Sequence, residues 1–186
     1  MALPSLGNGQ LAALAALAVV GFWMLGAYNR LVELRNAIKD AWARVDEALR
    51  QRSGALEPLV AALREPLAAE QRALDALLAA QHQAARAAGA MAARPVDADH
   101  AAAWVAAETT MAAAAARVFA LLDHQGDLRH IEQLPALVAI WREGEARLAF
   151  ARQLFNDAGT GYNEAIALFP TSLLARLFGF MPAGRL

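Results

Sequence analysis

The stretch YNRLVELRNAIKDAW, Tyr28 to Trp42, decides the fold, because it follows directly on an uncharged apolar run with no Gly, Pro or Ser between the two. After Tyr28, apolar residues recur in alternating steps of three and four, the pattern of a helix face packed in a bundle; they are Leu31, Leu34, Ile38, Ala41, Val45 and Ala48. We therefore predict one unbroken helix from about Gln10 to about Arg52. The sequence SGALEP, Ser53 to Pro58, is expected to end it.

The N-terminal segment has the composition of a membrane anchor. No Asp, Glu, Lys or Arg precedes Arg30, and Leu11–Ala27 is a run of 17 apolar residues. With Tyr28 this run spans roughly 27 Å, close to the hydrocarbon thickness of a bilayer. We expect an uncleaved anchor over residues 1–28 and a bundle domain over residues 29–186. A cleaved signal peptide would need a basic start, which is missing, and a buried core helix would need a large protein around it.

Basic residues near the apolar run predict its orientation. None precedes the run, and four follow it, at Arg30, Arg35, Lys39 and Arg44. Because short cytoplasmic flanks are enriched in Lys and Arg, we expect the N-terminus outside and the bundle in the cytoplasm, attached to the inner (cell) membrane.

The composition predicts an all-α fold. The chain is 58% hydrophobic but only 7% aromatic, because Ala, the best helix former, dominates, and no run of alternating β-branched residues indicates a strand. Four amphipathic segments with short connections predict an antiparallel up-down four-helix bundle.

Turn and cap signals divide the rest of the chain. We expect a second helix carrying Leu59, Leu63 and Leu67 up to Gly89, interrupted at Pro66. GAMAARPVDAD, Gly89 to Asp99, would be the next connection, with Asp97 or Asp99 capping the third helix. The remaining expectations are a stop at HQGD (His124 to Asp127), a fourth helix from about Ile131 to Phe169, and a last short turn capped by Thr171 or Ser172 that closes at Gly179.

The sequence lacks the residues or motifs that several classes of binding and catalysis require. A net charge of −1 gives no field that would attract nucleic acid. Zero cysteines exclude a disulfide, a thiolate metal site and a Cys nucleophile. No metal-ligand spacing, phosphate-binding loop or nucleophile elbow occurs, and the histidines fit surface or loop positions: His82, His100, His124 and His130. We therefore predict no catalytic residue, no cofactor and no metal.

Polar residues on the apolar stripes leave two alternatives open. Glu145 and Arg152 fall on the seam of the fourth helix, and Arg35 and Asp46 flank the seam of the first, near Trp42. Either these long side chains extend past the rim of the core, or they form a buried polar layer that joins the two helices and fixes their register.

Two stretches resemble the signatures of the LemA family. Tyr28–Arg52 has the Tyr-Asn, Leu-Val, Arg and Ala-Trp of the N-terminal signature, and Phe155–Phe180 has the Tyr-Asn, Phe-Pro and Gly-Phe of the C-terminal one. The chain departs from the pattern at Phe155, where the family has a tyrosine, and at Gly159 and Gly161. The resemblance implies a single-pass membrane protein with a helical-bundle domain. Its signature positions include Tyr28, Asn29, Arg35, Trp42 and Asp46.

These observations favour a membrane-anchored, non-enzymatic scaffold that mediates protein–protein interactions at the bacterial inner membrane. Its partners would be the lipid bilayer, through Leu11–Ala27, and membrane-associated proteins or a second copy. Candidate contact residues are Tyr162, Asn163, Phe178 and Phe180, which could instead dock the chain end onto its own bundle. The alternative is a membrane-tethered accessory hydrolase or metal-dependent enzyme with a polar centre at Arg35, Asp46, Glu145 and Arg152. A lipid remodeller would need a basic amphipathic face, which no predicted helix has.

Overall fold

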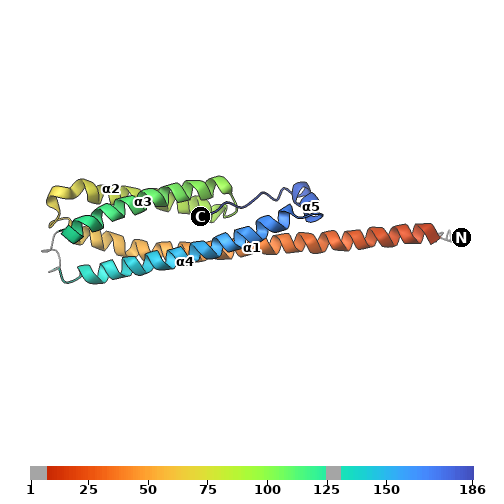
Figure 1. Cartoon of the computed structure of the whole chain (residues 1–186), viewed down its shortest axis with the longest axis horizontal. Coiled ribbons are helices and arrows are strands. Elements are labelled where there is room, and N and C mark those ends of the chain that lie inside the picture. Colours follow the sequence, from red (N-terminus) through yellow and green to blue (C-terminus); the bar gives the residue numbers. More distant parts are fainter. Residues whose placement is uncertain (1–7, 125–130) are drawn as a thin grey trace.

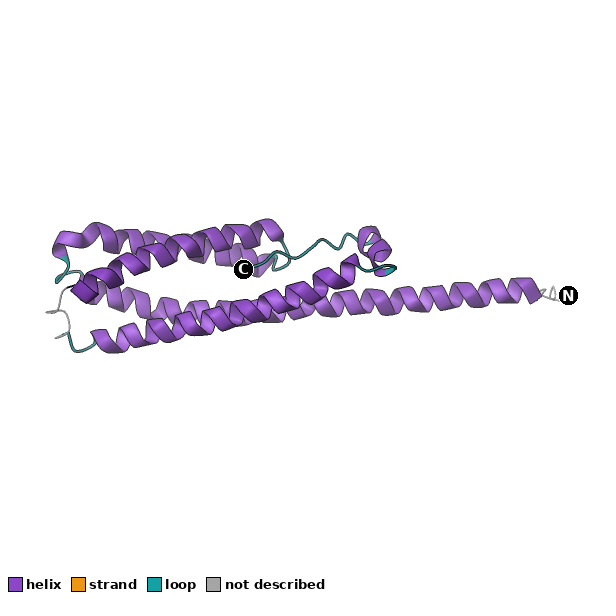
Figure 2. Ribbon diagram, in the orientation of Figure 1, coloured by secondary structure: helices purple, strands orange, loops and turns teal. Residues whose placement is uncertain are grey.

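The computed structural model describes residues 8–124 and 131–186, and these residues form helices, turns and loops without a strand. Figures 1 and 2 show the helices alternating in direction along one long axis. The elements are α1 (Asn8–Leu63), the 3₁₀ helix η1 (Ala68–Glu70), α2 (Gln71–Ala93), α3 (Ala98–His124), α4 (Leu134–Ala167) and α5 (Thr171–Leu177). The predicted all-α, up-down antiparallel bundle is confirmed.

The four long helices pack as two close pairs. α1 lies along α4, and α2 lies along α3, while side chains from all four helices meet in the core. The N-terminal half of α1 projects beyond the other helices (Figure 1). The short α5 lies beside α1 at the end of the bundle from which that half projects.

The first helix is unbroken, as the stretch after Tyr28 predicted. It contains 56 residues, about 84 Å at 1.5 Å per residue, and it is continuous between Gly26 and Arg30. Residues 9–30 are exposed or half-buried, and Leu31 is the first that is fully buried. One helix therefore passes from an uncovered apolar surface into a packed core.

The predicted end of this helix at Ser53–Pro58 is wrong. α1 continues through Pro58 to Leu63, and the side chains of Leu56, Leu59 and Leu63 are at most 1% exposed. Proline removes one hydrogen bond and crowds the carbonyl group four residues earlier, here that of Gly54, which is exposed. Burial of three leucines in the core outweighs this local cost, so Leu59 and Leu63 belong to α1 rather than to the second helix.

Other boundaries follow their local signals more closely. Pro66 lies in the turn after α1, and Asp97 caps α3, since its Oδ1 accepts hydrogen bonds from the backbone N–H groups of Asp99 and His100 at 3.0 and 3.1 Å. The pKa of Asp97 is lowered, chiefly by the hydrogen bond from His100. Gly179 has a φ of +69° and closes α5, as predicted.

Some predicted boundaries are wrong. α2 runs past Gly89 to Ala93, because Met91 is fully buried. α4 begins at Leu134 and ends at Ala167, and Pro170, rather than Thr171 or Ser172, occupies the N-cap position of α5. The expected stop HQGD lies outside the described residues beyond His124.

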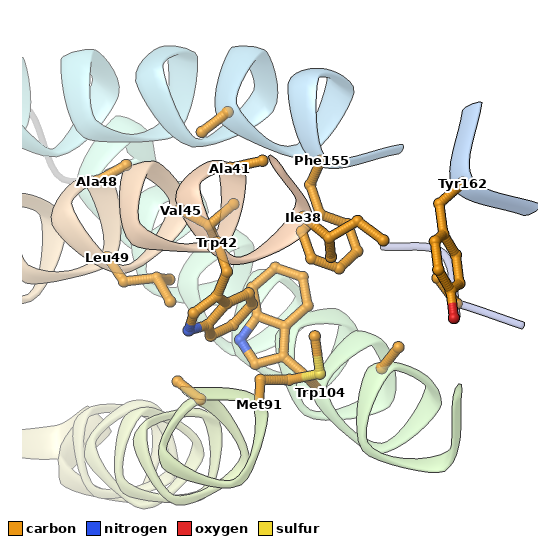
Figure 3. Close-up of a cluster of buried hydrophobic side chains, with 14 of the residues drawn as sticks. Ile38, Ala41, Trp42, Val45, Ala48, Leu49, Met91, Trp104, Phe155 and Tyr162 are labelled. Atoms are coloured by element: carbon orange, nitrogen blue, oxygen red, sulfur yellow. The ribbon is translucent and has the colours of Figure 1, made fainter. Parts of the chain in front are cut away.

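The core consists of two clusters along the bundle axis. Figure 3 shows the first, in which Trp42 packs edge-on against Trp104 and Phe155, with ring centroids 5.7 and 6.1 Å apart. The second contains Leu56, Met111 and Trp141. Trp42 and Trp104 are therefore core residues, and α1, α3 and α4 each contribute to both clusters.

Candidate functional site

Three charged side chains form an ion layer inside the bundle: Arg52 of α1, Glu108 of α3 and Glu145 of α4. Arg52 Nη1 and Nη2 donate to the two carboxylate oxygens of Glu108 at 2.8 Å each, and Nη1 also donates to Glu145 Oε1 at 2.8 Å. The side chains of Arg52 and Glu108 are 3% and 7% exposed, and that of Glu145 is 44% exposed. The layer is thus a buried bidentate pair with a third member at its edge.

The ion layer separates the two apolar clusters. On α1, Arg52 lies between Leu49 of the first cluster and Leu56 of the second. Glu108 lies between Trp104 and Met111 on α3, and Glu145 lies between Trp141 and Leu148 on α4. Arg52 and Glu108 therefore occupy inward positions of their helices, and Glu145 lies at the edge of the core, so a mismatched register of α1 and α3 would leave a buried charge unpaired.

Gly144 gives the ion layer room. A Cβ atom at this position would lie 2.9 Å from Arg52 Cβ and 3.0 Å from Arg52 Cα. α4 can approach α1 closely here only because residue 144 has no side chain. The Arg52 guanidinium also lies over the ring of Trp141, 5.3 Å from its centroid, an arrangement that favours the cation.

The ion layer holds its charges firmly. Burial alone would lower the pKa of Arg52, but the hydrogen bonds and charges of Glu108 and Glu145 outweigh it and raise that pKa. An arginine held in this way does not release a proton in the physiological range. The geometry suits alignment of three helices rather than proton transfer.

The structure brings together part of the sequence-predicted polar set. Asp46 pairs with Arg50 on the surface of α1 at 2.7 Å, and Arg35 is exposed. The Arg152 guanidinium lies 5.3 Å from the centroid of the Trp104 ring. Glu145 of the ion layer and Arg152 line one cavity with Arg52 and Glu108, whereas Arg35 and Asp46 do not line it. Asn29 is exposed beside Tyr28.

Arg52 and Glu108, the two strongest members of the layer, were missed as site residues. Their positions on apolar seams were the available signal. Among the described residues, no group of three or more His, Asp or Glu side chains is placed to hold a metal ion. His82 and His124 are exposed, His100 is half-buried, and His130 lies outside the described residues.

A second feature is the C-terminal tail, residues 180–186, which lies along α4 and is held by two asparagines. Asn163 donates to Ala183 O at 3.0 Å and accepts from Ala183 N at 2.8 Å. Asn156 makes the same two bonds to Leu186, at 2.9 and 2.8 Å. Seven helical residues rise about 10.5 Å, and three extended residues span about 10 Å. The distance between the two asparagines along α4 therefore matches the distance between Ala183 and Leu186 along the extended tail.

Tyr162 also holds the tail, and together with Asn156 and Asn163 it forms what we call the tail dock. Its side chain is buried, and its hydroxyl group donates to Met181 O at 2.9 Å. Burial raises the pKa of Tyr162, although the positive charge of Arg35 opposes the shift. Gly184 lies so close to α3 that a Cβ there would be 2.8 Å from Ala98 Cα. Tyr162 and Asn163, proposed as partner contacts, thus hold the chain's own tail.

The other two candidate contact residues lie at the exit of α1 from the bundle. The ring of Tyr28 packs edge-on against Phe178 and Phe180, with centroids 5.1 and 5.8 Å away. Phe180 is half-buried, whereas Phe178 is 52% exposed. This junction joins α1 to the loop that follows α5.

Within residues 8–124 and 131–186, two helices are long and apolar enough to cross a membrane by length and composition. In α3 part of the apolar window is buried, and the helix contributes Trp104 to the core. In α1 none of the window is buried. An uncovered apolar helix next to a bundle fits a membrane-associated helical protein.

Comparison with known sequences agrees with the C-terminal signature and with the last part of the N-terminal one. The sequence model of the LemA family matches residues 41–185, which include the ion layer, the asparagines that hold the tail, and the tail except Leu186. A comparison with curated proteins finds no significant match. Because the family match covers most of the chain, the protein belongs to the LemA family.

Proposed function

We propose that the protein is a membrane-anchored, non-enzymatic scaffold at the bacterial inner membrane, where its bundle mediates protein–protein interactions. The observation that carries the proposal is the continuity of α1. Its first half is apolar and uncovered, and its second half is one of the four long helices of a packed domain. A scaffold of this kind acts by holding its binding surfaces at the membrane rather than by chemistry.

The apolar half of α1 supports anchoring by its exposed surface. Leu17, Val19 and Phe22 are 69%, 67% and 76% exposed. Apolar area left in water costs about 25 cal/mol per Å², and a bilayer removes that cost. The first basic residue, Arg30, follows the apolar run and favours an external N-terminus with a cytoplasmic bundle.

Anchoring lowers the affinity that a partner in the same membrane needs in order to bind the bundle. Partners confined to the same membrane meet it at a raised effective concentration, so modest affinities suffice. The ion layer favours a single register of α1, α3 and α4, which would keep the bundle surface constant for a partner.

Photo-crosslinking in cells tests the scaffold. The crosslinking amino acid would replace Phe150 or Arg44, which line one groove between α4 and α1, in the otherwise complete chain. We expect both positions to capture the same membrane-associated protein or a second copy.

The control for anchoring uses matched substitutions in α1. Leu14→Arg with Leu17→Arg should abolish membrane insertion, since each Arg costs about 2.5–3.5 kcal/mol at the centre of a span, and crosslinking should fall with it. Leu14→Ala with Leu17→Ala should preserve both. Capture that is equally efficient without the anchor, or no capture from a series of surface positions, would refute the scaffold proposal.

A further inference from the structure

Exposed apolar side chains gather around α5. Six large ones, each between 52% and 80% exposed, lie within 14 residues of one another: Leu168, Phe169, Leu173, Leu177, Phe178 and Met181. In the described part of the bundle between Leu31 and Ala167, only Ile140 and Phe150 are comparably exposed. We call the six residues the α5 cap. Single exposed apolar residues are common on soluble domains, but a contiguous group marks an interaction surface.

The α5 cap lies next to the point where the apolar run of α1 ends. Phe178 of the cap packs against Tyr28, which directly follows Leu11–Ala27. α5 also lies against α1 at the end of the bundle from which the apolar half projects (Figure 1). The apolar surface of α1 and that of the cap are therefore continuous through the Tyr28 junction.

We propose that the α5 cap inserts into the bilayer interface beside α1 and forms a second attachment of the bundle to the same leaflet. The inference rests on the proposed anchoring of α1. Once Leu11–Ala27 spans the hydrocarbon, a group in contact with Tyr28 lies at the level of the headgroups and the first acyl carbons. The α5 cap would lie at this level without a conformational change, because it contacts Tyr28 of the anchoring helix.

The composition of the junction suits a lipid surface. Tyr28 is the aromatic type enriched at membrane interfaces. The side chain of Arg30 is 63% exposed and pairs with Glu33 at 2.8 Å, and Arg176 of α5 is exposed, so one paired arginine and one further arginine accompany the apolar group. Apolar side chains that insert shallowly beside arginines are typical of interfacial helices, which favour anionic headgroups. With two attachments, one face of the bundle would be turned permanently toward the membrane.

Site-specific fluorescence tests the insertion. The chain has no cysteine, so one introduced cysteine can be labelled uniquely with an environment-sensitive dye. The three positions are matched in exposure: Leu177→Cys in the cap (70% exposed), Leu17→Cys in the apolar half of α1 (69%) and Phe150→Cys on α4 (62%). The full-length protein would be reconstituted in vesicles of phosphatidylcholine with a minority of phosphatidylglycerol, carrying nitroxide quenchers at shallow or deep acyl positions.

We expect deep quenchers to act on the label at position 17, shallow quenchers to act on position 177, and neither to act on position 150. Quenching at 17 without quenching at 177 would overturn the cap proposal and leave anchoring intact. Absence of quenching at 17 would overturn anchoring itself. An apolar emission spectrum at 177 without lipid quenching would mean that protein covers the cap, which also overturns the proposal.

A second variant guards against local misfolding. Phe169→Cys, 80% exposed on the other side of Pro170, should repeat the result at 177. Its label should also be protected from a water-soluble quencher in vesicles. Failure of both cap positions to meet lipid, with normal helical content, would reject the inference.

Discussion

Arg52 carries a full charge to the centre of the bundle, where it bonds to both oxygens of Glu108. Removing water from two ions costs several kcal/mol for each, and their attraction does little more than offset this cost. The pair therefore contributes mainly to the choice of register, because any other alignment of α1 and α3 leaves a buried charge without a partner.

Arg52→Met should lower the free energy of unfolding by about 3–5 kcal/mol, since Glu108 then lies buried without its cation. The double variant Arg52→Met with Glu108→Leu should recover much of this loss. Arg50→Met is the matched control, because Arg50 pairs with Asp46 on the surface and should change stability by at most about 1 kcal/mol. Urea unfolding in detergent, followed by tryptophan fluorescence, measures the parent, these three variants and Glu108→Leu alone, which completes the double-mutant cycle. Additive effects in the double variant would contradict the coupling.

Gly144→Ala should destabilise the bundle by about 1–3 kcal/mol, because the new methyl group meets the backbone of Arg52, which cannot move aside as a side chain would. Gly161→Ala is the control on the same helix. Nothing lies within 4 Å of a Cβ at position 161, so the helix preference of Ala should raise stability by up to about 1 kcal/mol. The same unfolding assay distinguishes them; equal effects would show that α4 does not need a glycine at the layer.

Tyr162→Phe should cost about 1 kcal/mol through loss of the hydrogen bond to Met181. Since burial raises the pKa of Tyr162, the stability that its neutral form contributes is complete below the ordinary tyrosine value of about 10 and is lost as pH rises through the folded value. Unfolding measured from neutral to alkaline pH should therefore show a steeper alkaline decline in the parent than in Tyr162→Phe. Parallel curves would disprove this assignment.

At the scale of elements, the tail takes the place of a fifth packed segment although it has no secondary structure of its own. Its backbone bonds go to side-chain amides, which offer a donor and an acceptor just as a neighbouring strand would. A seven-residue spacing of asparagines on one helix face is thus the sequence feature that fixes an extended tail.

Asn163→Ala should free the tail at Ala183, because one substitution removes both hydrogen bonds to that residue. Two bonds of about 0.5–1.5 kcal/mol each, or about 1–3 kcal/mol together, predict amide exchange at Ala183 faster by a factor of about 5 to 150. Hydrogen exchange read by mass spectrometry checks this. Asn36→Ala, on the exposed face of α1, should leave the tail unchanged; if it does not, the effect is not specific to the dock.

Local patterns predicted the helices well where neighbours along the chain decide the structure. The cap of α3 and the stop at Gly179 depend on a few adjacent residues. Gly179 was predicted, and the cap was predicted as Asp97 or Asp99, of which the structure has Asp97. The end of α1 depends on whether distant helices bury Leu56 and Leu59, so the local signal of Pro58 gave the wrong boundary.

The ion layer could be predicted only in part for the same reason. A seam position indicates that Glu145 points inward, but which cation it meets depends on the relative height of two helices. The sequence indicated that charges lie on the stripes and did not indicate that Arg52, rather than Asp46 or Arg152, lies level with Glu108. The docking of Asn156 and Asn163 requires the path of the tail, which no periodicity describes.

At the scale of the whole molecule, the height of the bundle along α1 determines whether the cap reaches lipid. Inserting one alanine after Asn29 would rotate the preceding helix by about 100° relative to the bundle but move the cap away from the apolar half by only about 1.5 Å. Because lipid would surround that half on all sides, we expect the labels at positions 177 and 17 both to keep lipid quenching. Inserting seven residues nearly restores the phase but moves the cap by about 10.5 Å, so the label at 177 should lose quenching while position 17 keeps it. Unchanged quenching at 177 in the seven-residue insertion would mean that the cap reaches lipid independently of α1.

The missing hinge in α1 has a mechanical consequence. From Tyr28 to Leu63 the helix extends roughly 50 Å as a stiff lever, and a span tilts when its hydrophobic length exceeds the local bilayer thickness. A change in tilt of about 10° would sweep the distal tip sideways by about 9 Å. The position of the distal tip would in this way depend on the thickness, and so on the lipid composition, of the surrounding bilayer.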